Sequence, residues 1–256
     1  MNPVRVAIAG AGGRMGHALL EAAAGAEGIV IGAALDLQPG TYAGVAVGTD
    51  VATALAQSDV LIDFTRPEGT LAHLRACVAA RRAMVIGTTG LTPAQVEEVR
   101  SAARSIPIVM APNMSVGVNV ALKLVETAAR ALGPDYDVEV FEVHHKLKVD
   151  APSGTALKLG EVAAAARGTT LEKAGVFARH GTTGERKPGS IGFSVARAGD
   201  VVGDHTVFFA GPGERIEITH RSTSRATYAQ GAMRAAKFAA GKPPGLYDMQ
   251  DVLGLK

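Results

Sequence analysis

The chain has 256 residues, of which 47% are hydrophobic and 20% charged, so it is long enough to bury one large core or two modest ones. Its 26 basic and 24 acidic side chains leave a formal charge of +2, and only 4% of the residues are aromatic. Since the cations form no run and few rings are present to stack on bases, this composition argues against a nucleic-acid partner.

Nothing in the sequence predicts export or insertion into a membrane. The only cysteine is Cys77, so an internal disulfide is excluded. The apolar residues 4–9 are only long enough for a strand and lack the cationic start of a signal peptide. No apolar run approaches the ~20 residues that a membrane span needs. We therefore expect a cytoplasmic protein.

The first 112 residues alternate short apolar segments with helix-like segments. The apolar segments lack the polar alternation of a one-sided sheet, which is typical of parallel strands buried on both faces. Thr92-Pro93 and Arg66-Pro67 have the composition of helix starts. This pattern predicts an α/β fold with a Rossmann-like doubly wound parallel sheet. The expected strands are residues 4–9, 28–33, 59–64, 84–87 and 106–110.

From about Ser115 the rhythm of the sequence changes. We expect an α+β domain with a mainly antiparallel sheet, because the later strand-like segments alternate polar and apolar residues. Its expected helices are residues 116–132 and 154–167, its expected strands are 136–143, 190–198, 205–210 and 214–220, and 179–189 is expected to be a mobile loop.

An alanine-rich helix expected over residues 226–240 returns the chain to the first domain. The first predicted domain therefore comprises residues 1–114 and 225–256. The second predicted domain comprises residues 115–224.

A glycine-rich loop, Gly10-Ala11-Gly12-Gly13-Arg14-Met15-Gly16, follows the first expected strand and opens a helix. Such glycines let the backbone approach a pyrophosphate, whose charge is met by N–H groups and the helix dipole. The third glycine comes one position later than in the usual pattern, so the loop alone could be an ordinary strand-to-helix turn. Asp36 ends the second expected strand, where a carboxylate can bind the adenosine ribose. Together the loop and this acid predict a dinucleotide site.

Two further loops lie at the carboxyl ends of expected parallel strands, where ligands of open α/β sheets bind. They are Gly87-Thr88-Thr89-Gly90 and Ala111-Pro112-Asn113-Met114. Each could be only a loop, but together they predict the wall of a nicotinamide pocket.

The densest group of reactive side chains lies between Glu142 and Thr155. Burying two adjacent histidines, two lysines and an acid at a strand end would cost too much free energy of desolvation if they served only in packing. The alternative is a basic loop that stays exposed to solvent. Ser153-Gly154-Thr155 opens a helix, whose capping hydroxyl and N–H groups suit a carboxylate. The segment therefore predicts a site for an anionic substrate, and we expect no metal in it.

These motifs resemble the dihydrodipicolinate reductase (4-hydroxy-tetrahydrodipicolinate reductase) family of lysine and diaminopimelate biosynthesis. The resemblance runs from residue 4 to about 253. It implies reduction of 4-hydroxy-tetrahydrodipicolinate to tetrahydrodipicolinate by NADH or NADPH, and a homotetramer assembled through the sheets of the second domain. The motifs that carry it are the glycine loop, Asp63-Phe64-Thr65, Gly87-Thr88-Thr89-Gly90 and His144-His145-x-x-Lys148-x-Asp150-Ala151-Pro152-Ser153-Gly154-Thr155-Ala156.

The resemblance also implies roles for individual residues. His144 is expected to donate or accept a proton, and Lys148 to donate one. The expected substrate ligands are His145, Ser153, Gly154, Thr155 and Arg225. The expected cofactor ligands are Gly10, Ala11, Gly12, Gly13, Arg14, Met15, Asp36, Gly87, Thr88, Thr89, Ala111, Pro112, Asn113 and Met114. Arg66 joins this set because its charge could reach a 2′-phosphate.

The cofactor preference depends on Asp36 and its neighbours. Leu37 follows Asp36, whereas many family members carry a basic residue there. A carboxylate beside the ribose repels the 2′-phosphate of NADPH unless Arg14 or Arg66 compensates. We therefore expect both cofactors to work, with NADH modestly favoured. Two alternatives remain, namely another Rossmann-type dehydrogenase of a small carboxylate and a non-catalytic dinucleotide sensor.

Overall fold

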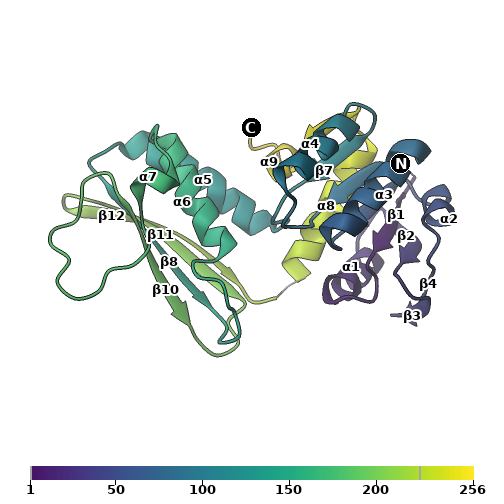
Figure 1. Ribbon diagram of the computed structural model, residues 1–256, viewed down its shortest axis with the longest axis horizontal. Helices are drawn as coiled ribbons and strands as arrows, with labels where there is room; N and C mark the ends of the chain where they lie inside the picture. The colour runs from purple at the N-terminus through teal and green to yellow at the C-terminus, as the bar shows by residue number, and fades with distance from the viewer. Residues whose placement is uncertain (1, 225) are drawn as a thin grey trace. The chain divides into compact units, whose positions relative to one another are not determined.

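The computed structural model describes residues 2–224 and 226–256, and the chain forms two compact units (Figure 1). Unit 1 comprises Met1–Val116 and Arg225–Lys256, and unit 2 comprises Gly117–Ser224. Arg225, an expected substrate ligand, lies outside the described residues. No helix in the described ranges is long and apolar enough to cross a membrane.

Unit 1 is built on a six-stranded sheet in the order β13-β7-β6-β5-β1-β2, in which every neighbouring pair is parallel. The predicted Rossmann-like sheet is confirmed, with a short sixth strand, β13, that the sequence did not predict. The strands are β1 (Val4–Ala9), β2 (Ile29–Leu35), β5 (Val60–Asp63), β6 (Ala83–Ile86), β7 (Pro107–Met110) and β13 (Gly245–Tyr247).

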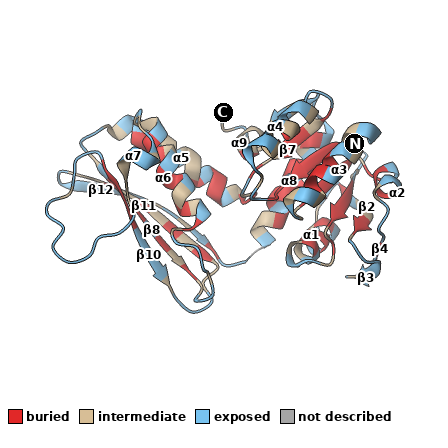
Figure 2. Ribbon diagram, viewed as in Figure 1, coloured by how far each residue is buried: buried red, intermediate tan, exposed pale blue. Residues whose placement is uncertain are grey.

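The strands of this sheet are mostly buried (Figure 2), and the residues of β1, β2, β5, β6 and β7 are divided between two hydrophobic cores, one on each face. Val6 and Ile8 of β1 pack with helices α1 (Arg14–Ala24) and α8 (Ala226–Ala240). Ala7 and Ala9 enter the other core, with helices α2 (Val51–Ala56), α3 (Pro67–Ala80) and α4 (Pro93–Ala102). The short helix α9 (Met249–Leu253) adds Met249 to the first core.

The helix starts follow the expected chemistry. Pro67 is at the first position of α3, and Thr92 forms a capping box with Gln95 at the start of α4. A two-stranded sheet of β3 (Gly40–Tyr42) and β4 (Val45–Val47) was not predicted. Its turn places Ala43 and Gly44 at positive φ, a conformation that tight hairpins need but that an Ala-Gly pair signals only weakly.

Unit 2 contains a five-stranded sheet in the order β12-β11-β8-β10-β9. The pairs β8–β11 and β11–β12 are antiparallel, as expected, whereas β8–β10 and β10–β9 are parallel. The sheet is therefore mixed, because the chain between β8 and β10 crosses over through a helix and re-enters in the same direction. The strands are β8 (Asp137–His144), β9 (Gly175–Val176), β10 (Ile191–Arg197), β11 (Gly203–Gly211) and β12 (Glu214–Ser222).

The helices α5 (Val116–Leu132), α6 (Gly154–Ala166) and α7 (Leu171–Ala174) accompany this sheet. The core joins alternate sheet residues such as Val140 and Phe209 to Val125 of α5 and Leu159 of α6. Phe141, whose side chain emerges on the opposite face from Val140, is 43% exposed. One face of the sheet is therefore buried and the other carries exposed apolar side chains.

The segment expected to be a mobile loop, residues 179–189, contains no helix or strand in the described structure. Arg179 and Arg186 in this segment both form ion pairs with Glu139 of β8. The loop is thus fastened to the sheet at two points.

Candidate active site

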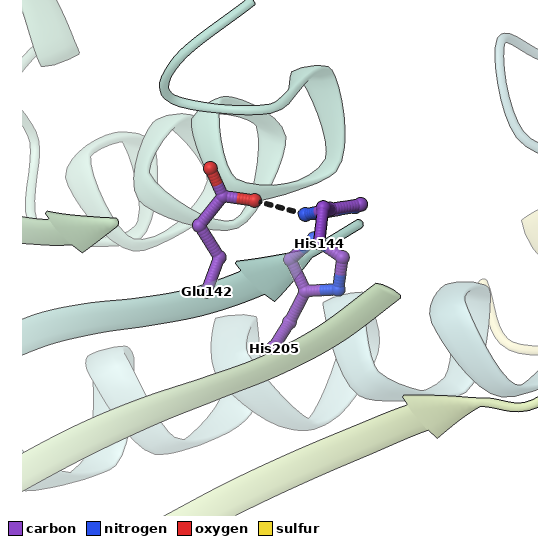
Figure 3. A group of neighbouring side chains, drawn as sticks. All are labelled: Glu142, His144 and His205. Atoms are coloured by element: carbon purple, nitrogen blue, oxygen red, sulfur yellow. Dashed lines mark ion pairs between the residues drawn. The ribbon is translucent and has the colours of Figure 1, made fainter. Parts of the chain in front are cut away.

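The site in unit 2 starts from two side chains on the same face of β8. Glu142 and His144 are two residues apart, so both point into the protein, and they are 2% and 8% exposed. His144 Nδ1 lies 2.5 Å from Glu142 Oε2 (Figure 3). The distance is that of a close ion pair, but the two groups are poorly aligned for a hydrogen bond. Glu142 thus holds the imidazole at the end of the strand.

Glu142 also connects three elements through its other carboxylate oxygen. Oε1 accepts hydrogen bonds from the backbone N–H of Ser153, at 3.0 Å, and from Nη2 of Arg197 on β10, at 3.2 Å. Burial favours a raised pKa for Glu142, but hydrogen bonding from Ser153 and the nearby His144 and Arg197 outweigh it and hold the pKa below its usual range. A buried carboxylate that remains charged therefore lies beside His144.

His144 is next to a second buried histidine, His205 of β11, whose ring centroid lies 5.0 Å away in an edge-to-face arrangement. Burial is the main cause that lowers the pKa of His144, and Glu142 only partly opposes it. Burial and the neighbouring His144 lower the pKa of His205 to about 4. His205 is therefore neutral at physiological pH, whereas the lowered pKa of His144 makes its imidazole a group that can take up a proton and give it back.

His205 was not among the predicted site residues. Its Nε2 lies 3.0 Å from Oγ of Ser153, so it supports the start of α6. The sequence did contain a signal for His205, because it is two residues before Val207 and four before Phe209 and therefore points to the same buried face of the strand. A histidine at such a core-facing position needs a polar partner.

The loop after β8 carries Lys148 and His145. The Lys148 backbone N–H donates to the carbonyl of His145, at 3.1 Å, and its Nζ donates to Oδ1 of Asp150, at 2.8 Å. Lys148 lies near enough for its charge to lower the pKa of His144. The two residues expected to handle protons are thus brought together.

The helix α6 begins directly after this loop. Ser153 is its N-cap, and its hydroxyl accepts a hydrogen bond from Ala156 N–H at 3.2 Å, as predicted. Gly154 and Thr155 form the first turn. The positive end of the helix dipole therefore lies next in the chain to the loop that carries Lys148, an arrangement suited to a carboxylate.

The glycine loop of unit 1 has the geometry of a phosphate cradle. Gly10 has a φ of +72°, which few other residues adopt. A Cβ at Gly16 would overlap the Gly10 carbonyl oxygen and the backbone of Ala11, so the late third glycine lets the helix pack directly on the loop. The displaced spacing thus has a structural reason.

Asp36 lies directly after β2, beside this loop. Its Oδ2 accepts a hydrogen bond from Gly12 N–H at 2.7 Å. A cleft of roughly 1110 Å³ opens here, and Asp36 shares its lining with both candidate cations, Arg14 and Arg66, and with Tyr42 of the unpredicted β3–β4 sheet. The expected ribose ligand and its possible phosphate partners therefore surround one cleft.

The other expected cofactor residues lie outside this cleft lining. In the described structure, the cleft includes neither residues 87–89 nor residues 111–114. Pro112 and Thr89 are exposed, whereas Ala111 and Met114 are buried in the hydrophobic core, and Oδ1 of Asn113 accepts a hydrogen bond from Ser115 N–H. These segments follow β6 and β7, at the same edge of the sheet as Asp63.

Asp63, at the end of β5, is a further polar centre for which no site role was predicted. It is fully buried and accepts hydrogen bonds from Thr65, Thr70 and Thr88, and His73 Nδ1 lies 2.6 Å from its Oδ2. Burial favours a raised pKa, but hydrogen bonding from His73 and Thr65 outweighs it, so the pKa of Asp63 is lowered. One carboxylate thus fastens the loops after β5 and β6 to helix α3.

Comparison with known families covers almost the whole chain. Residues 4–114 match the family described as "Dihydrodipicolinate reductase, N-terminus", and residues 117–253 match "Dihydrodipicolinate reductase, C-terminus". The chain belongs to the dihydrodipicolinate reductase family. The resemblance read from the motifs is therefore confirmed.

Curated members of this family are similar along their full length. The chain is 60% identical to the 4-hydroxy-tetrahydrodipicolinate reductase of Bordetella pertussis, an alignment that covers 99% of this chain and 98% of that protein. It is 56% identical to the same-named protein of Aromatoleum aromaticum, over 100% of this chain and 97% of that one.

Among solved structures, a dipicolinate-bound dihydrodipicolinate reductase from Paenisporosarcina sp. TG-14 has a TM-score of 0.81 at 25% identity, covering 97% of this chain and 98% of the other. An NAD complex of GenD2, from gentamicin A biosynthesis, has a TM-score of 0.61 at 17% identity and shares the fold, covering 100% of this chain and 91% of the other.

Proposed function

We propose that the protein reduces 4-hydroxy-tetrahydrodipicolinate to tetrahydrodipicolinate, with NADH or NADPH, in lysine and diaminopimelate biosynthesis. The observation that carries the proposal is the proton-handling group of His144, Glu142 and Lys148 beside the start of α6. It occurs in a chain 60% identical to a curated 4-hydroxy-tetrahydrodipicolinate reductase. Neither rival prediction, another dehydrogenase or a dinucleotide sensor, accounts for both findings.

The glycine loop fits a dinucleotide. The close approach of α1 at Gly16 and the left-handed Gly10 form a cradle that a Cβ would fill. Gly10 to Met15 are proposed to hold the pyrophosphate, and Asp36 the ribose. When bound, the reduced nicotinamide supplies a hydride. Arg14 and Arg66, in the same cleft as Asp36, support use of both cofactors, with NADH favoured by no more than about tenfold.

The residues of unit 2 are proposed to bind the substrate carboxylates and to supply a proton. A hydride added to a carbon–carbon double bond conjugated with an imine leaves negative charge toward the nitrogen, which a positioned acid must neutralise. Lys148 is the proposed proton donor, and His144, held by Glu142, donates or accepts a proton beside it. His145, Ser153, Gly154 and Thr155 are proposed to contact the substrate, with the α6 N-terminus binding a carboxylate.

The exposed apolar face of the five-stranded sheet supports a homotetramer. Phe141 is 43% exposed on the face opposite the core, and the ring of Phe208, on the same face of the adjacent strand β11, lies 4.7 Å from it. Contiguous exposed apolar groups of this kind mark association surfaces. A Phe141→Glu variant is expected to sediment as a smaller species than the wild type, and an unchanged sedimentation coefficient would argue against this surface. The cytoplasm is the proposed location.

The reaction is tested with the condensation product of pyruvate and aspartate semialdehyde, by following nicotinamide absorbance. Turnover is expected, and replacing His144 by Asn or Lys148 by Ala is expected to lower kcat by about 10² to 10⁴, the usual share of a general acid. Lys158→Ala is the matched control, because this lysine is half exposed on α6 and pairs only with Glu161 among the described residues. No turnover by the wild type, or normal kcat in both variants, would overturn the proposal.

A further inference from the structure

We propose that Glu142, His144 and His205 bind one Zn²⁺ ion, and that this ion inhibits the enzyme. The three residues belong to the adjacent strands β8 and β11 and are all buried (Figure 3). Each offers one possible ligand atom, and these atoms all lie within 4.8 Å of one another. Binding of the ion does not depend on the proposed reaction, whereas its inhibitory effect does.

Each of the three side chains carries one buried polar atom that makes no hydrogen bond within the described structure. These atoms are Oε2 of Glu142 and Nδ1 of His144, which contact each other as an ion pair at 2.5 Å, and Nδ1 of His205. Buried polar atoms of this kind are rare, because each costs the free energy of its lost hydration. An ion bound by these atoms would take the place of the contact between Glu142 and His144 and would also satisfy Nδ1 of His205.

The other atoms of these side chains already have the supporting contacts of metal ligands. His205 meets Oγ of Ser153 through Nε2, and Glu142 accepts from Ser153 N–H and from Arg197 through Oε1. In metal sites, such hydrogen bonds to the second atom of a ligand fix its orientation. The cluster is therefore oriented as well as close together.

Two histidines and a glutamate are a common ligand set for zinc, which leaves a fourth position for water or a substrate oxygen. Calcium and magnesium prefer oxygen ligands, so this set disfavours them. The charged Glu142 attracts a cation, while Arg197 and Lys148 nearby oppose it. We therefore expect reversible binding at about micromolar concentration, well weaker than a structural zinc site. An ion held by His144 removes the imidazole that the proposed reaction uses.

The direct test is calorimetric titration of ZnCl₂ into the full chain, stripped with a chelator and free of any histidine tag, without cofactor or substrate. One ion per chain is expected. His205→Asn is expected to weaken binding at least about tenfold. His220→Asn is the matched control, because His220 lies opposite His205 on β12 and also has a buried Nδ1 without a hydrogen bond in the described residues. It is expected to keep the wild-type affinity.

The proposal is overturned if the wild type shows no saturable binding, or if His205→Asn binds as tightly as the wild type. Equal losses in His205→Asn and His220→Asn would also overturn it. If His205→Asn does not fold, Glu142→Gln takes its place. Cobalt in the wild type gives an independent answer, since intense tetrahedral absorption supports the site and a weak octahedral spectrum refutes it.

The effect on turnover is a separate measurement. Zinc is expected to inhibit the wild type and His220→Asn at equal concentrations, with recovery after EDTA. If the enzyme proves inactive in the reductase assay, the proposed function fails but the titrations still decide the zinc site. If the enzyme turns over and zinc binds without inhibiting it, the inhibitory part of this proposal is wrong.

Discussion

Replacing Asp63 by Asn tests whether one buried carboxylate holds the cofactor side of unit 1 together. Asn keeps the shape of the side chain and one acceptor oxygen for the surrounding threonines. It removes the negative charge, and its amide nitrogen replaces Oδ2, the oxygen that lies 2.6 Å from His73 Nδ1. Hydrogen bonds to a charged group contribute about 1.5–3 kcal/mol each, and breaking a buried ion pair costs about 3–5 kcal/mol. Because one acceptor survives and His73 is 16% exposed, we expect a loss of about 2–3 kcal/mol.

Urea unfolding of the cofactor-free protein measures this loss, and Asp59→Asn is the matched control. Asp59 lies just before β5, but its pairing with Arg5 is at the surface, with the Asp59 side chain 33% exposed. Such pairs contribute less than about 1 kcal/mol. Asp63→Asn is also expected to raise the KM for NADH, because Thr65 and Thr88 lose their anchor. Equal unfolding free energies for the two variants would refute the reasoning.

The pH dependence gives a second check on Asp63. Its pKa in the folded protein is below the ordinary value of 3.8, so its contribution to stability is present above that value and is lost as the pH falls through the lower folded pKa. The wild type and Asp63→Asn are therefore expected to differ fully at pH 5 to 7 and to converge below about pH 4. A difference that stays constant into that acid range would contradict a charged Asp63.

Three further outcomes are expected. Glu142→Gln should lower kcat about 100-fold with a smaller change in KM, because it removes the charged group that orients the imidazole of His144. Steady-state kinetics measure this, and an unchanged kcat would contradict it. Arg14→Ala or Arg66→Ala should reduce kcat/KM for NADPH and leave that for NADH nearly intact, whereas a strong wild-type preference for NADPH would show that Asp36 has been misjudged. Cys77 is buried, which raises its pKa to about 12, so Ellman's reagent should modify it only in denaturant, and rapid labelling of the native protein would contradict its burial.

The parallel sheet of unit 1 was predictable because its strands are continuous apolar segments separated by well-capped helices. The strand β13 and the β3–β4 sheet were missed because each strand has only three residues, and Ala43-Gly44 is a weak turn signal. The mixed sheet of unit 2 was partly missed, although the helix predicted over residues 154–167 already implied a crossover between parallel strands.

At the candidate site, the sequence indicated His144, Lys148 and the Ser153 cap because they lie in one short segment. It gave no role to His205 or Arg197, whose contacts with that segment depend on the pairing of β8 with β11 and β10. Side chains that meet only through sheet register leave no local spacing to recognise. For the same reason, the hydrogen bonds that link Asp63 to Thr88 were invisible before the fold was known.

The order in which the chain is synthesised has a consequence for its folding. One of the two cores of unit 1 requires α8, which is made after all of unit 2. While the ribosome is still producing residues 117–224, one face of the sheet, including Val6 and Ile8, has α1 but lacks α8. Unit 2 is a continuous segment, so every strand and helix that it needs is present before unit 1 can close. We therefore expect unit 1 to expose apolar surface until α8 is made, and truncations before α8 to leave it prone to aggregation.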